Sequence, residues 1–175
     1  MIKLKHGSGR SAGYRFVTAE ELESLRRVGR IVVETRRYGN VYAVDRKSLD
    51  EARQRGAIPV THIGNLADMR RLLAETPSVS WLRVLLWVPR SECEKRSLER
   101  GDLDTAERLA AWDQTSADVL DSDVKDLFDM VIRTDRTDPT TAAKEISGER
   151  VRTRDALRRD ELEAALALPR GDGAS

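Results

Sequence analysis

The segment from Trp81 to Val88 constrains the fold more than any other part of the chain. Its sequence, Trp-Leu-Arg-Val-Leu-Leu-Trp-Val, is the most apolar strand candidate, and Pro89 ends it. A strand that is apolar on both faces is usually central in a parallel sheet, because helices cover both sides of such a sheet. We therefore expect an α/β layer fold in which Trp81 and Trp87, on one face of this strand, lie in the core.

The remaining segments alternate between strand and helix patterns. Three pairs of a hydroxyl residue and a glutamate three positions later are capping-box signals that predict helix starts: Thr18/Glu21, Ser48/Glu51 and Ser91/Glu94. Residues 1–13 show no period and are interpreted as a loop. Other segments predict strands over 14–17, 30–38, 41–44, 58–63 and 129–134, and helices over 66–75, 105–117, 140–146 and 149–168.

Composition excludes several classes of protein. The 175 residues support one domain, and 31 basic against 30 acidic residues give a net charge of +1, which does not indicate nucleic-acid binding. The single cysteine, Cys93, excludes an internal disulfide and leaves no Cys cluster for zinc. No apolar run approaches the roughly 18 residues of a membrane span. We expect a cytoplasmic protein with no metal site, no nucleic-acid partner and no membrane contact.

Several short motifs occur in an order that resembles one known family. They are Tyr14-Arg-Phe-Val before a Glu-rich helix, the Tyr-Gly-Asn-Val-Tyr hairpin at 38–42, the Arg-Gly pair at 55–56, Val88-Pro-Arg-Ser, Leu98-Glu-Arg-Gly and Glu107-Arg-Leu. In this order and spacing, residues 14–146 resemble a guanylate kinase from its monophosphate-binding region to its final helix.

The resemblance implies a P-loop-NTPase-like parallel sheet, truncated at its N-terminus, with a small β-hairpin subdomain that binds a nucleoside monophosphate and a helical lid. Residues 1–146 would form this guanylate-kinase-like domain, with the monophosphate-binding region at 14–63 and the lid at 91–118. Residues 147–175 would form a charged helix and tail that docks onto the domain, onto a partner or onto a second copy in a homo-oligomer. The ancestral reaction would be phosphoryl transfer from MgATP to a nucleoside monophosphate.

By the same resemblance, Lys5, Tyr14 and Tyr42 would bind the substrate phosphate. Arg100 and Arg108 would be lid arginines that approach the phosphates when the domain closes. These residue types suit the reaction, because catalysis of phosphoryl transfer is mostly positioning and positive charge on the oxygens. Each residue also has a structural interpretation: tyrosines in the core, a lysine solvated in a loop, and arginines on a solvated helix face.

The positions that would bind the base depart from the family pattern. Val33 stands where the family has a glutamate, Val44 where it has a serine, and His62 where it has an aspartate. Glu34 is adjacent to Val33, but side chains alternate along a strand, so we expect it to point away. Apolar walls would leave the polar edge of guanine without partners. We therefore do not expect specificity for guanine.

The phosphate-binding loop that holds ATP in the family is also missing from these residues, since no Gly-Lys dipeptide occurs. The nearest imitation is Gly7-Ser-Gly-Arg-Ser11, with Leu4 in place of the first glycine and Gly13 where a helix should follow. Two hypotheses stay open. The domain binds a phosphorylated small molecule or a phospho-peptide without phosphoryl transfer, or it is a kinase whose loop is missing from this numbering or supplied by another chain.

Overall fold

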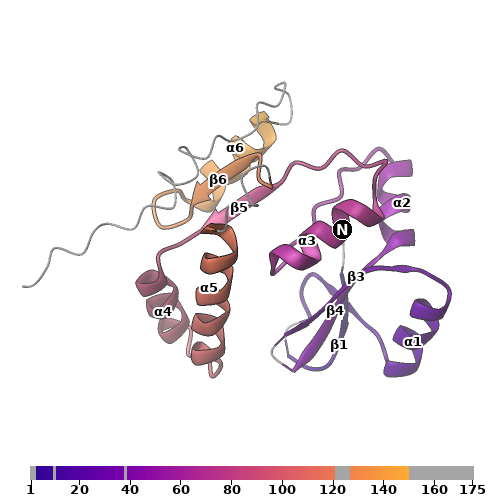
Figure 1. The fold of residues 1–175 in the computed structure, drawn as a ribbon, viewed down its shortest axis with the longest axis horizontal. Coiled ribbons are helices and arrows are strands. Elements are labelled where there is room, and N and C mark those ends of the chain that lie inside the picture. Colours follow the sequence, from indigo (N-terminus) through magenta and orange to yellow (C-terminus); the bar gives the residue numbers. More distant parts are fainter. Residues whose placement is uncertain (1–2, 10, 38, 121–126, 150–175) are drawn as a thin grey trace, which may run out of the picture. The chain divides into compact units, whose positions relative to one another are not determined.

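The computed structural model describes residues 3–9, 11–37, 39–120 and 127–149. The chain divides into two compact units, Met1–Ser80 and Trp81–Ser175 (Figure 1). The described part of the first unit consists of β1 (Lys3–His6), β2 (Tyr14–Phe16), α1 (Ala19–Arg27), β3 (Ile31–Arg37), β4 (Asn40–Asp45), α2 (Arg46–Gln54) and α3 (Leu66–Glu75). That of the second consists of β5 (Val84–Trp87), α4 (Arg90–Glu99), α5 (Thr105–Leu120), β6 (Met130–Arg133) and α6 (Pro139–Glu149).

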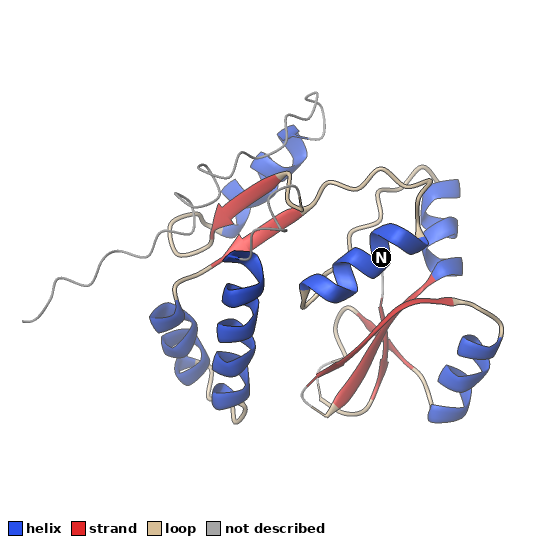
Figure 2. Ribbon diagram, viewed as in Figure 1, coloured by secondary structure: helices blue, strands red, loops and turns tan. Residues whose placement is uncertain are grey.

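The first unit is built on a sheet with the strand order β2-β1-β4-β3 (Figure 2). Strand β1 runs parallel to β2 and antiparallel to β4, and β3 and β4 form the predicted hairpin. The prediction of a loop over 1–13 is wrong for Lys3–His6. The alternation in Lys-Leu-Lys is that of a strand, but the two charged residues made the segment resemble a solvated loop. The two neighbouring strands supply the hydrogen bonds that stabilise it.

Helix α1 covers one face of this sheet. Leu4 and Leu22 are 1% and 2% exposed and form a core cluster with Val17 and Ala43, and burying each leucine stabilises the fold by about 1.5–3 kcal/mol. The predicted capping box is confirmed, because Glu21 N donates to the hydroxyl of Thr18 and Thr18 N donates to the Glu21 carboxylate. This face therefore forms the apolar core of the first unit.

Helix α3 begins at the residue that the sequence predicted, whereas helix α2 does not. The N-cap of α3 is Asn65, whose side-chain oxygen accepts from Asp68 N at 2.8 Å. Helix α2 begins at Arg46 with Asp45 as its N-cap, so the prediction of a capping box at Ser48 is wrong. The carboxylate of Asp45 is the stronger acceptor for the free amides of the first turn, and the Ser48 hydroxyl donates to it at 3.0 Å.

The predicted strand over 58–63 is not formed. These residues form no regular element and pair with no strand of the described chain, and the apolar side chains Ile58 and Val60 are 50% and 72% exposed. Pro59 lacks the amide that a ladder needs. The apolar pattern was therefore a poor guide to pairing in this segment.

In the second unit, β5 and β6 form a parallel pair, which confirms the α/β class. Trp87, Phe128 and Ile132 are buried, so the prediction that Trp87 lies in the core is confirmed. Trp81 precedes the strand and is only partly buried. Within the described residues β5 pairs with β6 alone, so the prediction of a central strand is not met there.

The predicted helices of the second unit are present with shifted bounds. Helix α4 begins at Arg90 with Pro89 at the cap position and no side-chain hydrogen bond, so the capping box predicted at Ser91 is wrong. Proline places the preceding backbone in an extended conformation and tolerates a helix directly after it. Gly101, with φ of +69°, ends α4 as predicted. The charged helix predicted over 149–168 falls on residues that, after Glu149, lie outside the described part of the chain.

Candidate functional site

Two lysines and three aromatic residues occupy one face of the first sheet, opposite the face that α1 covers. In register, Lys3 lies beside Tyr14, and Lys5 lies between Phe16 and Tyr42. Residues paired in register share a face of the sheet, and residues two apart along a strand do so as well. We call Lys3, Lys5, Tyr14, Phe16 and Tyr42 the basic-aromatic face. The structure therefore brings together the three residues that the resemblance assigned to a phosphate.

The lysine of the central strand lies among the three rings. Lys5 Nζ is 5.4 Å from the ring centroid of Tyr14, 5.2 Å from that of Phe16 and 5.7 Å from that of Tyr42. The rings of Tyr14 and Tyr42 are 5.4 Å apart. Lys5 is only 3% exposed, so these cation–π contacts act in a partly desolvated environment, where each is worth about 2 kcal/mol. Sequence reasoning placed Lys5 in a loop and missed Phe16, although Phe16 lies two residues from Tyr14.

Lys3 extends the positive charge along the same strand. Its Nζ lies 5.8 Å from the ring centroid of Tyr42 and donates to the carbonyl oxygen of His62 at 2.8 Å. Burial lowers the pKa of Lys3, and the carboxylate of Asp68 acts in the opposite direction. Lys3 thus links the sheet to the segment between α2 and α3 that carries His62.

A glycine-rich turn follows β1 and lies against the basic-aromatic face. A Cβ on Gly7, whose φ is +132°, would be 2.1 Å from Asn40 Oδ1, and a Cβ on Gly9 would be 3.6 Å from Lys5 Nζ. Ser8 N donates to the same Asn40 oxygen at 2.7 Å. This is the segment that imitates a phosphate-binding loop, but strand β2 follows it rather than a helix.

The three residues predicted for a base pocket do not share one environment. Val33 and Val44 are register partners, are 2% and 0% exposed, and carry no polar side-chain group that could bind the edge of a base. His62 keeps an exposed surface. Desolvation lowers the pKa of His62, and the positive charges of Lys3 and Arg37 lower it further.

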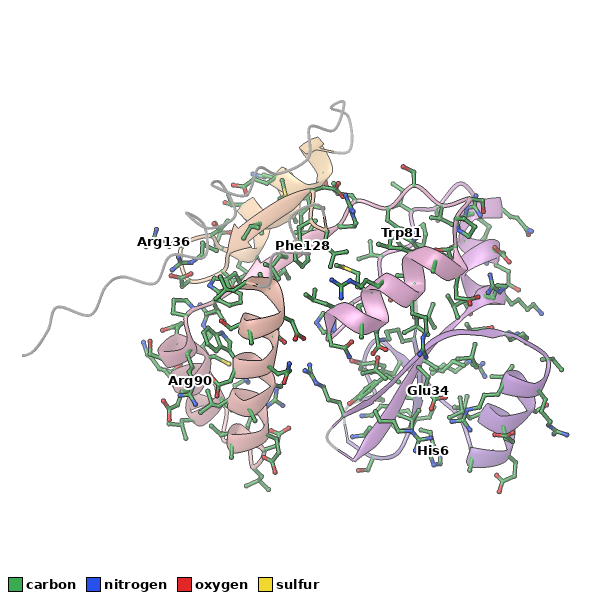
Figure 3. The ribbon with its side chains drawn as sticks, in the orientation of Figure 1. His6, Glu34, Trp81, Arg90, Phe128 and Arg136 are labelled. Atoms are coloured by element: carbon green, nitrogen blue, oxygen red, sulfur yellow. The ribbon has the colours of Figure 1, made fainter. Side chains whose placement is uncertain are left out.

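Glu34, labelled in Figure 3, is the register partner of Ala43 and so lies on the face that α1 covers, as expected. Its two oxygens accept from Arg26 of α1 at 2.8 Å and 2.9 Å. This bidentate ion pair explains why the glutamate adjacent to Val33 does not reach the basic-aromatic face.

A polar cluster on the same face as Tyr42 was not anticipated from the sequence. Thr35, the register partner of Tyr42, donates its hydroxyl to Asp68 Oδ2, and Asn65 Nδ2 donates to the same oxygen at 2.8 Å. Farther along β3, Arg37 donates to the carbonyl oxygen of Gly64 at 2.9 Å. The start of α3 is thereby fixed over the sheet, and the partly exposed carboxylate of Asp68 lies at Thr35, the register partner of Tyr42.

A hollow of about 350 Å³ lies at the end of the hairpin. It is lined by two cationic side chains and three smaller residues: Arg36, Arg37, Gly39, Asn40 and Val41. Asn40, which lines the hollow, also accepts the hydrogen bond from Ser8 N of the glycine-rich turn, so the turn lies next to the hollow.

In the second unit, the two predicted lid arginines meet at one carboxylate. Arg100 Nη2 donates to Asp102 Oδ2 at 2.7 Å, and Arg108 Nε lies 3.3 Å from the same oxygen and 2.7 Å from Asp104 Oδ1. Hydrogen bonding from Arg100 lowers the pKa of Asp102, and Arg108 adds to the effect. The structure thus brings Arg100, at the end of α4, and Arg108, in the first turn of α5, to the same carboxylate of Asp102.

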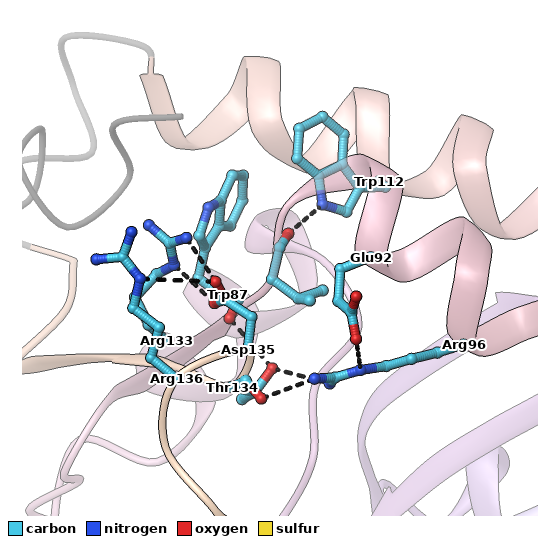
Figure 4. A network of polar contacts seen from close by, with 9 residues as sticks. Trp87, Glu92, Arg96, Trp112, Arg133, Thr134, Asp135 and Arg136 are labelled. Carbon is cyan, nitrogen blue, oxygen red and sulfur yellow. Dashed lines mark hydrogen bonds and ion pairs between the residues drawn. The ribbon is translucent and has the colours of Figure 1, made fainter. Parts of the chain in front are cut away.

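A neighbouring arginine has a structural role instead. Arg96 donates to Glu92 at 2.8 Å and to the carbonyl oxygen of Thr134 at 2.9 Å (Figure 4). Thr134 in turn donates its amide to the carbonyl oxygen of Trp87, whose ring is 5.1 Å from that of Trp112. These contacts join α4 and α5 to the ends of β5 and β6.

Two further searches were confined to the described part of the chain. Within residues 3–9, 11–37, 39–120 and 127–149, no three His, Cys, Asp or Glu side chains are grouped so that they could hold a metal ion. Within the same ranges, no helix combines the length and apolar character needed to cross a membrane.

Comparison with known proteins supports a fold assignment. No protein-family model matches the sequence, and no curated protein matches it. The structure is similar to a crystal structure of guanylate kinase from Anaplasma phagocytophilum, with a TM-score of 0.58 and 20% sequence identity. The match covers 93% of this chain and 82% of that chain. At this identity the likeness shows the fold alone, and the chain has a guanylate-kinase-like α/β fold.

Proposed function

We propose that the first unit binds a phosphorylated ligand resembling a nucleoside monophosphate on its basic-aromatic face. The observation that carries the proposal is the convergence of Lys5, Tyr14 and Tyr42, whose ring centroids lie 5.4–5.7 Å from the Lys5 ammonium. A lysine supplies positive charge to a phosphate, and tyrosine hydroxyls donate hydrogen bonds that orient its oxygens. The fold likeness to a guanylate kinase supports the same assignment.

We also propose that these residues alone do not transfer a phosphoryl group from ATP. Transfer needs a loop whose backbone amides and lysine hold the β- and γ-phosphates. The sequence contains no Gly-Lys dipeptide, and the glycine-rich turn after β1 leads into a strand. A turn followed by a strand lacks the helix N-terminus that helps to bind phosphates in such loops.

Calorimetric titration of the full chain with mono-, di- and triphosphates tests the binding site. We expect a monophosphate to bind, and Lys5→Met to weaken it at least tenfold, since a hydrogen bond to a charged group is worth about 1.5–3 kcal/mol. Arg15→Met is the matched control, because Arg15 lies between Tyr14 and Phe16 on β2 and so faces the other side of the sheet.

The same titrations show whether the bound phosphate belongs to a small molecule or to a phospho-peptide. Inorganic phosphate, nucleoside monophosphates and a phosphoserine peptide are compared with their unphosphorylated counterparts. Equal binding of phosphorylated and unphosphorylated compounds contradicts the proposal. Tighter binding of the peptide than of every monophosphate assigns the site to a phospho-peptide instead.

A second candidate function is an ATP-dependent nucleoside monophosphate kinase whose phosphate-binding loop comes from outside these residues. The grouping of Arg100 and Arg108 at Asp102 favours it, because two adjacent guanidinium groups suit the charge of a transferred phosphoryl group. Measurement of ADP release from MgATP and a monophosphate decides between the candidates. Turnover that falls on Arg108→Ala supports the kinase.

A further inference from the structure

We propose that Asp68 reads the base of the bound ligand, by accepting a hydrogen bond from a base N–H on Oδ1. The inference rests on the proposed phosphate site and names the class of ligand: a nucleoside monophosphate whose base carries an N–H donor. It assigns a specificity-determining role to a residue outside the positions that the sequence indicated.

The first step concerns how Asp68 is held. Its Oδ2 accepts from the hydroxyl of Thr35 and from Asn65 Nδ2, and its backbone amide donates to Asn65 Oδ1 at 2.8 Å. Both donors use one oxygen, and no donor from the described residues reaches Oδ1. The side chain is therefore fixed in orientation while one carboxylate oxygen keeps its capacity to accept.

The second step concerns where Oδ1 lies. Thr35 is the register partner of Tyr42, which is in turn the register partner of Lys5. Adjacent strands are about 4.8 Å apart, so Thr35 and Lys5 are separated by about 10 Å across the sheet. Asp68 is partly exposed above Thr35 and close enough to Lys3 to act on its charge. A ligand with its phosphate at Lys5 would thus extend its other end toward Asp68.

The third step excludes the competing readers. Val33 and Val44 are buried and carry no polar group, and both oxygens of Glu34 are bound by Arg26 on the other face. Among the described residues, Asp68 is the carboxylate that lies on the same face of the sheet as the basic-aromatic face, at Thr35 beside Tyr42. A carboxylate accepts from the amino group of adenine, cytosine or guanine alike, so this reader favours bases with donors without selecting guanine.

The test compares AMP with purine riboside 5′-monophosphate, which lacks the amino group, by calorimetry on the full chain. For the wild type we expect AMP to bind at least tenfold more tightly. Asp68→Asn should weaken AMP about tenfold, whereas the affinity for the donor-free ligand should stay equal or rise, because that ligand loses no hydrogen bond and one negative charge leaves the site. Asp50→Asn, an exposed aspartate on α2 of the same unit, is the charge-matched control and should change neither affinity.

The outcomes separate this inference from the function on which it rests. If the wild type binds both monophosphates equally, or if Asp68→Asn changes both affinities by one factor, the inference is wrong and the phosphate site stands. If neither compound nor inorganic phosphate binds to the wild type, the proposed function is wrong, and so is the inference that rests on it. Because the wild-type comparison needs no variant, the result does not depend on whether Asp68→Asn folds.

Discussion

Substitution of Tyr42 separates the contribution of its ring from that of its hydroxyl. The ring centroid lies 5.7 Å from Lys5 Nζ, 5.8 Å from Lys3 Nζ and 5.4 Å from the ring centroid of Tyr14. Tyr42→Leu removes all three contacts while keeping an apolar side chain, and Tyr42→Phe keeps the ring. The two variants should therefore differ in stability as well as in binding.

The magnitude follows from the number of contacts and their burial. A cation–π contact contributes about 0.5–2 kcal/mol, depending on desolvation, and an aromatic pair contributes about 0.5–1.5 kcal/mol. Lys5 and Lys3 are 3% and 9% exposed, so their ammonium groups depend on the ring more than surface lysines would. We expect Tyr42→Leu to lower the free energy of unfolding by about 2–4 kcal/mol and Tyr42→Phe by no more than about 1.5 kcal/mol.

Urea unfolding followed by far-UV circular dichroism measures these differences, and hydrogen exchange of the β1 amides locates the loss in the first unit. Tyr42→Phe should also weaken a monophosphate about two- to tenfold if the hydroxyl binds the phosphate. If Tyr42→Leu costs less than about 1 kcal/mol, or if both variants cost the same, the ring does not hold the lysines and the reasoning is refuted.

Three further predictions concern the turn, the histidine and the reaction. Gly7→Ala should destabilise the first unit by about 1–3 kcal/mol, because φ is +132° and the new Cβ would meet Asn40; Gly13→Ala, whose Cβ has open space, tests strain alone. Since the pKa of folded His62 is lowered from 6.5, the unfolded chain binds more protons near that pH. The free energy of unfolding should therefore fall on acidification below pH 6.5. If a His62→Gln variant loses as much stability over the same pH range, His62 is not the cause. Finally, the chain with MgATP and GMP should release no ADP, and turnover at about 1–100 per second would show that an ATP site exists.

Much of the fold could be predicted because it depends on local signals. The capping box at Thr18 and the boundaries of α3 rest on interactions within a few residues, and the structure confirms them. The helix predicted from Ser91 is present, but its capping box is not, because Pro89 takes the cap position and acts as a stronger local signal than the hydroxyl. Where signals compete within one turn, the pattern gives the element but not its first residue.

The phosphate-binding residues illustrate what resemblance contributed and what it left out. Lys5, Tyr14 and Tyr42 were indicated by sequence order, and the register of three strands brings them to one face. Lys3 and Phe16 share that face only because β1 pairs with both β2 and β4. The alternation of Lys3-x-Lys5 and, farther along the chain, of Tyr14-x-Phe16 was the sequence signal that could have found them.

By itself the sequence determined the α/β class, the hairpin and the separation of Glu34 from Val33, since each follows from the period of the side chains along the backbone. Only the tertiary structure decided that Lys5 is buried among aromatic rings and that Val33 and Val44 are buried as register partners. It alone brought Asp68 over Thr35, thirty-three positions away in the chain. Burial and pairing between distant segments depend on which surfaces exclude water together, and that depends on the whole unit rather than on any local pattern.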